Sequence, residues 1–150
     1  MKHLLLLLII GLLFNSCSKK TAEKQAAEDD KILLQYISDN SLTATKASSG
    51  LYYVIDSQGS GASCHSSSDV MVAYKGYFTN GEVFDESSAS GISFNLQQVI
   101  EGWTLGIPYF KEGGVGKLLL PSALAYGKKG TSGIPENSVL IFDIELIQVL

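Results

Sequence analysis

The residues with the most distinctive chemistry are aromatic and aliphatic side chains spread over the second half of the sequence. They fall in residues 72–74, 84–85, 99–103 and 124–127, and Phe142 near the C-terminus belongs with them. Aromatic rings from separate segments of the sequence, with the carboxylate of Asp85 among them, suit the binding of an apolar ring such as that of proline. They do not suit hydrolysis or redox chemistry, which need an activated nucleophile or a cofactor. We therefore hypothesise a site that rotates peptide bonds preceding proline.

Composition and charge narrow the classes of function. The chain has 150 residues, which predicts one domain. Its 45% hydrophobic and 17% charged residues are typical of a globular protein. The formal net charge of −4 and the absence of a basic block disfavour nucleic acid as a partner. All 11 basic residues are lysines, so the chain cannot bind phosphate through the bidentate hydrogen bonds of an arginine.

The N-terminus is predicted to be a lipoprotein signal peptide over residues 1–16. Lys2 and His3 precede a nearly unbroken apolar run at residues 4–13. A run of about 10 residues is shorter than the roughly 20 that span a bilayer, but it suits the core of a signal peptide. Residues 14–17 (Phe-Asn-Ser-Cys) resemble a bacterial lipoprotein processing site with Cys17 as the lipidated residue. This predicts a membrane lipoprotein of the bacterial cell envelope that faces the periplasm; plain secretion with an unmodified Cys17 is the alternative.

The remaining cysteine gives no sign of a disulfide or a metal site. Only Cys17 and Cys64 are present, so a lipid on the first leaves Cys64 without a partner in the chain. Cys64 and His65 lie together in a serine-rich stretch, but two ligands are too few for a metal. We expect a solvated loop here, and neither a metal nor a cofactor.

Residues 17–48 are predicted to be a polar tether followed by a short amphipathic helix. Within residues 22–37, Ile32, Leu33, Tyr36 and Ile37 recur at helical steps. Such a helix packs on its own domain in the simplest interpretation. The same pattern also allows a homodimer through residues 22–38.

Residues 49–150 read as one α+β domain. Alternating or continuous apolar patterns predict strands at residues 50–55, 70–78, 83–84, 92–96, 116–120 and 139–149. Asn80-Gly81 predicts a hairpin turn, and a helix is expected from about Gln97 to Leu105. Many strands with one central helix imply an antiparallel sheet wrapped around that helix.

Four blocks between residues 69 and 150 resemble the FK506-binding-protein (FKBP) family of peptidyl-prolyl cis-trans isomerases. They are Val-Ala-Tyr-Lys-Gly with Gly-Glu-Val-Phe-Asp-Glu-Ser, then Gln-Val-Ile-Glu-Gly-Trp, Leu-Ala-Tyr-Gly and Gly-Ile-Pro-Glu-Asn-Ser-Val-Leu-Ile-Phe-Asp-Ile-Glu-Leu. Each block alone is weak, but all four in order are specific. The resemblance implies a half-open antiparallel sheet around a short helix, with a pocket between them. It also implies an isomerase that acts on proline-containing unfolded or flexible polypeptides, assists the folding of exported proteins and binds macrolide inhibitors.

The resemblance also assigns roles within the pocket. Trp103 is expected at its floor, Tyr74, Phe84, Phe94 and Phe142 at its walls, and Val99 and Ile100 at its rim. The Ile100 N–H and the Tyr126 hydroxyl are expected to bind substrate carbonyls, Ile134 to cap the pocket, and Asp85 to lie at its edge. We place Tyr74, Asp85, Trp103, Tyr126 and Phe142 in the catalytic set. Taken singly, each of these residues also suits an ordinary place in a core, loop or turn.

The chain departs from the family pattern at two places. Ser90 stands where family members often carry an arginine, so Asp85 is expected to bond Tyr74 or a backbone N–H instead. The flap between Tyr126 and Ile134 is about one residue short, with Gly133 replacing an apolar residue. These departures leave open a noncatalytic proline-binding or chaperone module. A structural role in an envelope machine such as that of gliding motility, assembled through residues 32–37, is a further alternative, whereas a Ser-His-Asp hydrolase has little support.

Overall fold

The computed structural model describes the backbone of residues 2–150 and the side chains from residue 19 onward. The side chains of the predicted signal peptide (residues 1–16) and of Cys17 lie outside the described residues. The helices are α1 (Lys2–Asp39) and α2 (Glu101–Gly106), with three short 3-10 helices, η1 (Ile107–Tyr109), η2 (Ser122–Leu124) and η3 (Gly127–Lys129). The strands are β1 (Thr45–Lys46), β2 (Tyr52–Ser57), β3 (Asp69–Tyr77), β4 (Val83–Glu86), β5 (Ile92–Asn95), β6 (Gly114–Leu120) and β7 (Leu140–Val149).

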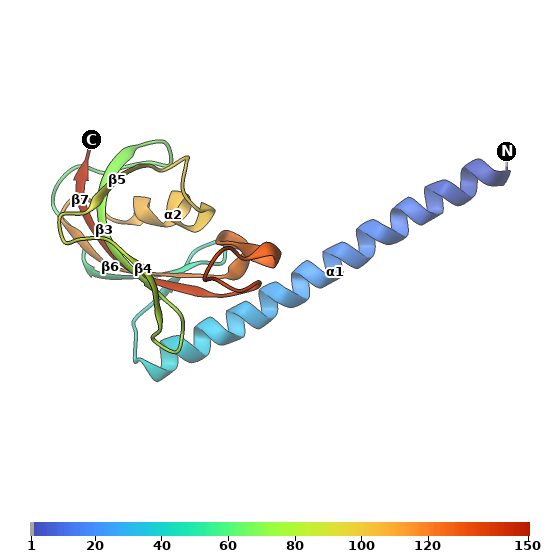
Figure 1. The fold of residues 1–150 in the computed structure, drawn as a ribbon, viewed down its shortest axis with the longest axis horizontal. Coiled ribbons are helices and arrows are strands. Elements are labelled where there is room, and N and C mark those ends of the chain that lie inside the picture. The colour runs from blue at the N-terminus through green and yellow to red at the C-terminus, as the bar shows by residue number, and fades with distance from the viewer. Residues whose placement is uncertain (1) are drawn as a thin grey trace.

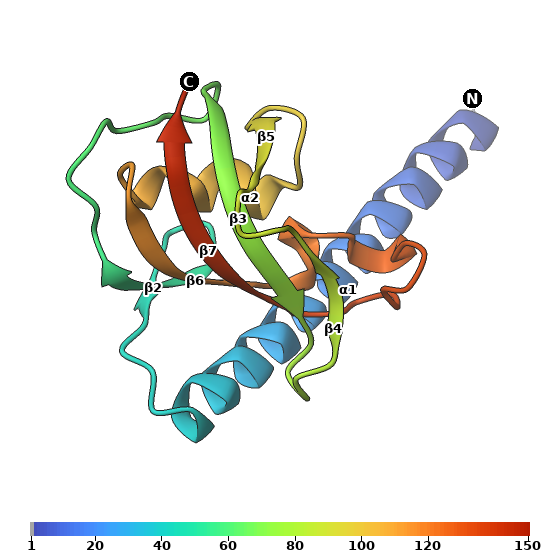
Figure 2. The same ribbon diagram turned by 60° about the vertical axis from the view of Figure 1, so that its left-hand side comes forward.

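The strands form one antiparallel sheet in the order β1-β2-β6-β7-β3-β4. Strand β3 changes partner along its length: residues 69–72 pair with β5, and residues 75–77 pair with β4. The strands curve around α2 (Figures 1 and 2), so the predicted α+β class with a half-open sheet is confirmed. The hairpin predicted at Asn80-Gly81 is also present, with Gly81 at a φ of 87° and the Phe78 N–H bonded to Glu82.

Each face of the sheet has its own apolar cluster. On the face toward α2, Trp103 and Ile107 pack against inward residues of the long strands, including Val72, Leu118 and Phe142. On the opposite face, Leu33 of α1 packs against Tyr52, Val54, Leu119, Val139 and Ile141. Burial on both faces explains why neighbouring residues of β6 and β7 are buried together instead of alternating strictly with exposed ones.

Helix α1 therefore packs on its own domain, as the simpler interpretation expects. Leu33 is fully buried, whereas Ile32 and Leu34 on either side of it stay exposed. The helix is longer than predicted, because it already includes residues 2–21, and its N-terminal part runs away from the sheet (Figure 1). Among the residues searched, no helix combines the length and the apolar character needed to cross a bilayer.

Helix α2 begins later than predicted, at Glu101 and not near Gln97. The reason is Asn95, whose side-chain oxygen accepts the Gln97 N–H at 2.9 Å and whose carbonyl accepts the Gln98 N–H at 2.9 Å. This Asx turn competes with helical hydrogen bonding. Val99 and Ile100 consequently lie in the turn before the helix.

The expectation of a solvated loop at Cys64 is wrong for that residue. Its side chain is buried in the same core cluster as Trp103, and burial raises the pKa of its thiol. The Gly61 N–H donates to the Glu112 carbonyl, and the Glu112 N–H donates to the Ala62 carbonyl. These two bonds hold the loop against the domain. His65 is exposed, and the described side chains contain no group of three or more His, Cys, Asp or Glu that could hold a metal.

Candidate functional site

A cavity of about 430 Å³ opens between α2, the β3–β4 pair and the segment after η2. Ten residues line it: Tyr74, Phe84, Asp85, Phe94, Gln98, Val99, Ile100, Trp103, Tyr126 and Phe142. Nine of the ten predicted site residues meet here, from six separate stretches of chain. Asp85 is the only charged residue in the lining, so the cavity offers apolar contact and a few polar groups.

Trp103 occupies the centre of this arrangement. Its ring centroid lies 5.0 Å from that of Tyr74, 5.4 Å from Phe94 and 5.5 Å from Phe142. The interplanar angles are 82°, 85° and 81°, so each neighbour meets the indole edge to face, a favourable geometry for aromatic pairs. Only 4% of Trp103 is exposed, yet it lines the cavity. Three rings thus fix the indole as the floor.

The indole N–H of Trp103 is buried and has no hydrogen-bond partner among the described residues. A buried donor without an acceptor is uncommon in folded proteins because its lost hydration is not replaced. In this position the N–H is a polar group within an otherwise apolar floor.

Tyr74 and Asp85 form the polar edge of the cavity. The Tyr74 hydroxyl donates to Asp85 Oδ2 at 2.7 Å, as expected for a chain without the family's arginine. Burial, reinforced by this bond to a carboxylate, raises the pKa of Tyr74 to about 12. The hydroxyl therefore remains protonated at neutral pH. Ser90 lies elsewhere, with its Oγ 2.8 Å from that of Ser88.

The turn before α2 supplies the rim. Val99 and Ile100 are partly buried and line the cavity, and Ile100 is the N-cap of the helix. No described residue accepts the Ile100 N–H, which leaves that donor for another acceptor. Gln98 also lines the cavity and was missed by the sequence reasoning. Its place directly before the apolar rim pair was the available signal.

The segment after η2 carries Tyr126, whose side chain is 38% exposed at the cavity edge. Ile134, predicted to cap the cavity from the flap, is not among the lining residues. It is 7% exposed and packs in the core cluster, where a bridge to Thr131 holds its backbone. The ordered flap thus contributes Tyr126 to the lining and Ile134 to the core.

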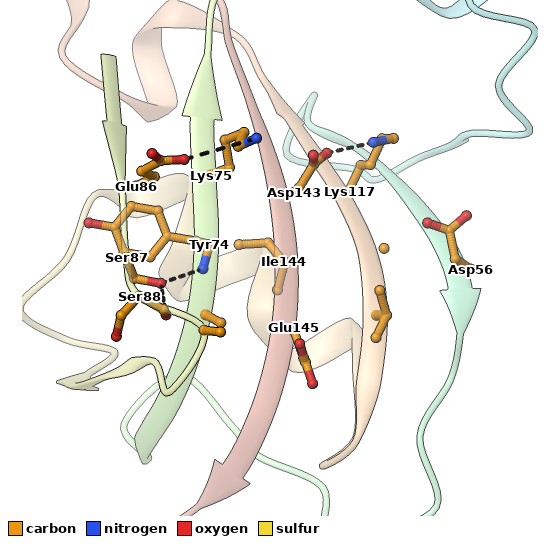
Figure 3. A pocket seen from close by; sticks show the side chains of 14 residues that line it. Asp56, Tyr74, Lys75, Glu86, Ser87, Ser88, Lys117, Asp143, Ile144 and Glu145 are labelled. Carbon is orange, nitrogen blue, oxygen red and sulfur yellow. Dashed lines mark hydrogen bonds and ion pairs between the residues drawn. The ribbon is translucent and has the colours of Figure 1, made fainter. Parts of the chain in front are cut away.

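A second cavity, of about 470 Å³, lies on the opposite face of the sheet (Figure 3). Two ion pairs belong to its lining. Lys117 pairs with Asp143 at 2.5 Å, and Lys75 pairs with Glu86 at 3.9 Å. Further carboxylates at Asp56 and Glu145 make its lining charged. An apolar ring would have to displace water from these charges, so the aromatic cavity is the better candidate site.

Comparisons with known proteins agree with the fold. The sequence profile of the FKBP-type peptidyl-prolyl cis-trans isomerases matches residues 61–147. This match covers more than half of the chain, so the chain belongs to the FKBP-type peptidyl-prolyl cis-trans isomerase family.

Individual relatives extend the similarity into the N-terminal region. An FKBP-type isomerase named FkpA from Buchnera aphidicola is 43% identical over 133 residues, which are 87% of this chain and 52% of that protein. The crystal structure of FkpA from Escherichia coli has a TM-score of 0.73 at 39% identity, covering 90% of this chain and 65% of that one. A peptidyl-prolyl isomerase from Pseudomonas syringae has a TM-score of 0.74 at 27% identity, covering 85% and 94%. The chain spans about half the length of the curated relatives it matches first.

Proposed function

We propose that this chain is a peptidyl-prolyl cis-trans isomerase that acts on unfolded or flexible exported polypeptides. The observation that carries the proposal is the aromatic cavity, in which Trp103 is framed edge-on by Tyr74, Phe94 and Phe142. Such a floor offers a flat apolar surface of the size of a pyrrolidine ring. The family to which the chain belongs is named for the same reaction.

The reaction needs no reactive group, because no bond is broken. Rotation about a peptide bond must overcome the loss of amide resonance, a barrier of about 18–20 kcal/mol. X-Pro bonds populate both isomers and interconvert over tens to hundreds of seconds. A catalyst must bind the twisted amide more tightly than either planar form. Lowering the barrier by roughly 5 kcal/mol accelerates rotation by about 10³- to 10⁴-fold.

The lining residues suit the twisted amide. Its nitrogen is pyramidal and less polar than that of a planar amide, so an apolar wall solvates it better than water does. Its carbonyl and the flanking ones need fixed donors. We assign these roles to the Tyr126 hydroxyl at the cavity edge and to the Ile100 N–H, while Asp85 holds the Tyr74 hydroxyl in place.

A protease-coupled assay on X-Pro peptides tests the proposal. We expect wild-type protein to accelerate isomerisation, and a macrolide inhibitor of the family to suppress it. Tyr126→Phe should lower kcat/KM about fivefold, the equivalent of one hydrogen bond of about 1 kcal/mol. Tyr109→Phe is the matched control, because Tyr109 is also 38% exposed but does not line the cavity.

No acceleration over buffer would overturn the isomerase assignment. Should the same protein still bind a proline-containing peptide, with the affinity lowered by substitution of Trp103, the site would be the noncatalytic binding module left open by the sequence. Equal effects of Tyr126→Phe and Tyr109→Phe would remove the assigned role of Tyr126 alone.

A lipid on Cys17 is the proposed anchor, and it would hold the domain at the envelope membrane on its periplasmic side. Support comes from the apolar run at residues 4–13 and the processing-site pattern that ends at Cys17. Labelled palmitate should be incorporated into the full chain in bacteria and not into Cys17→Ser. Labelling that persists in Cys17→Ser would exclude this anchor.

A further inference from the structure

A buried carboxylate joins α1 to the segment that leads into the cavity. Asp29 of α1 and Ser122 at the start of η2 are 0% and 1% exposed and are the buried polar or charged residues of the described chain. Asp29 Oδ2 accepts the Ser122 N–H at 2.8 Å and the Ser122 hydroxyl at 2.6 Å. The two residues are 93 positions apart in sequence.

The geometry of α1 explains how the carboxylate reaches this position. Asp29 and Leu33 are one turn apart and therefore share a face of the helix. Leu33 packs on the sheet, which presses that face against the domain and brings Asp29 to η2. Gln25, one turn earlier, donates from Nε2 to Asp29 Oδ1 at 2.8 Å. Three neutral donors thus compensate the loss of hydration, and together they fix the orientation of the carboxylate.

The bonds to Ser122 satisfy a group that its own helix leaves unpaired. The first N–H groups of a helix have no partner within it and are usually capped by a side chain at the N-cap. The N-cap of η2 is Pro121, which makes no side-chain cap. Asp29 fills this role from a different element, at a site closed to water.

Ser122 in turn sets the path of the chain to Tyr126. The Leu124 N–H donates to the Pro121 carbonyl and the Ala125 N–H to the Ser122 carbonyl, both at 3.0 Å, so two backbone bonds link η2 to Ser122 and its N-cap. Tyr126 follows η2 after Ala125 and lines the cavity. Among the described residues no side chain hydrogen-bonds its hydroxyl. The position of Tyr126 therefore depends on its backbone, which η2 holds on one side and the bond from the Gly130 N–H to the Tyr126 carbonyl, at 3.2 Å, holds on the other. We infer that Asp29 is a positioning residue that holds Tyr126 at the cavity by capping η2, an inference that rests on the role proposed for Tyr126.

The neighbouring residue provides a matched control. Asp30 also ties α1 to the domain, because its Oδ1 accepts from Lys46 Nζ at 2.6 Å and from the Tyr52 hydroxyl at 2.9 Å. These partners lie in β1 and β2. Asp30 and Lys46 line a cavity together with Pro121 and Leu124, but neither of them bonds Ser122. Loss of Asp30 weakens the docking of α1 without touching the cap. Effects specific to Asp29 therefore report on the cap.

The kinetic test is a double-mutant cycle in the full chain. Asp29→Ala should approach the about fivefold loss of kcat/KM expected for Tyr126→Phe, since it removes the same contact indirectly. Asp29→Asn, which keeps one acceptor oxygen, should restore part of that loss, and Asp30→Ala should lose less than about twofold. In the Tyr126→Phe background, Asp29→Ala should have almost no further effect, because coupled residues are not additive. Additive losses would overturn the inference.

A second readout does not depend on turnover. In protein labelled with fluorotyrosine, the ¹⁹F resonance of Tyr126 is identified by its absence from Tyr126→Phe. We expect Asp29→Ala to shift or broaden it and Asp30→Ala to leave it in place. An unchanged resonance in Asp29→Ala, or an equal change in Asp30→Ala, would overturn the inference. A shift in a protein without isomerase activity would support the positioning role and refute the proposed function.

Should Asp29→Ala fail to fold, Ser122→Ala gives the same test in a milder form. It removes the bond from the hydroxyl and keeps the bond from the N–H. The Tyr126 resonance should then move in the same direction by a smaller amount, and no movement would count against the inference.

Discussion

Replacing Trp103 with alanine is expected to abolish measurable isomerase activity and to lower the free energy of unfolding by about 3–5 kcal/mol. The indole contacts three rings edge to face and is 4% exposed, so its removal leaves a large void beneath the cavity. Tyr74, Phe94 and Phe142 would lose the indole that keeps their rings apart. The activity per folded molecule and the midpoint of urea unfolding, measured on one preparation, give the two effects separately.

Phe110→Ala is the control for this prediction. Phe110 is fully buried in the same core cluster but does not line the cavity, so its loss should cost a similar free energy of unfolding. Isomerase activity per folded molecule should remain close to that of the wild type. Were Trp103→Ala to retain wild-type kcat/KM, the indole would be a core residue only, and the floor of the site would have to lie elsewhere.

Gly116→Ala is expected to destabilise the fold by about 3 kcal/mol, at the upper end of the usual cost of overpacking. Gly116 lies in β6 between β2 and β7 and is buried. A Cβ there would overlap the backbone carbonyl oxygen of Val54 and lie 2.9 Å from the Phe110 ring. The carbonyl belongs to a paired strand, so it cannot move aside without breaking sheet hydrogen bonds.

The adjacent Val115 provides the comparison, because its side chain is 39% exposed on the same strand. Val115→Ala changes a residue of β6 without adding an atom to the core, and its effect should stay below about 1 kcal/mol. Urea unfolding monitored by Trp103 fluorescence measures both variants. A loss for Gly116→Ala no larger than that for Val115→Ala would mean that the sheet can widen at this point.

The sequence predicted the structure best where local patterns determine the fold. The long strands β3 and β7 follow from patterns of inward residues. Nine of the ten predicted site residues line one cavity, and all of these except Phe94 lie in the four family blocks. The start of α2 was misplaced because apolar spacing does not reveal that Asn95 ties down the next two residues. Cys64 looked solvated because its neighbours are serines, although the loop folds inward at that one side chain.

Long-range contacts were beyond the reach of pattern reasoning. Nothing in the polar run around Asp29 distinguishes it from its solvated neighbours, since its partner Ser122 lies 93 residues away. Ile134 was expected at the cavity because the family resemblance assigned it there, but its side chain packs in the core, where a bridge to Thr131 holds its backbone. These contacts depend on how distant elements pack against each other, and the secondary-structure propensity of a local segment does not determine them.

The apolar cluster beneath α1 bears on how a minimal fragment of this protein behaves. A fragment that starts at residue 49 would bare Tyr52, Val54, Leu119 and Ile141, which Leu33 now shields. Several neighbouring apolar side chains on an exposed sheet surface promote self-association in concentrated solution. A fragment that keeps this cluster covered therefore has to begin upstream of Leu33, inside the helix itself.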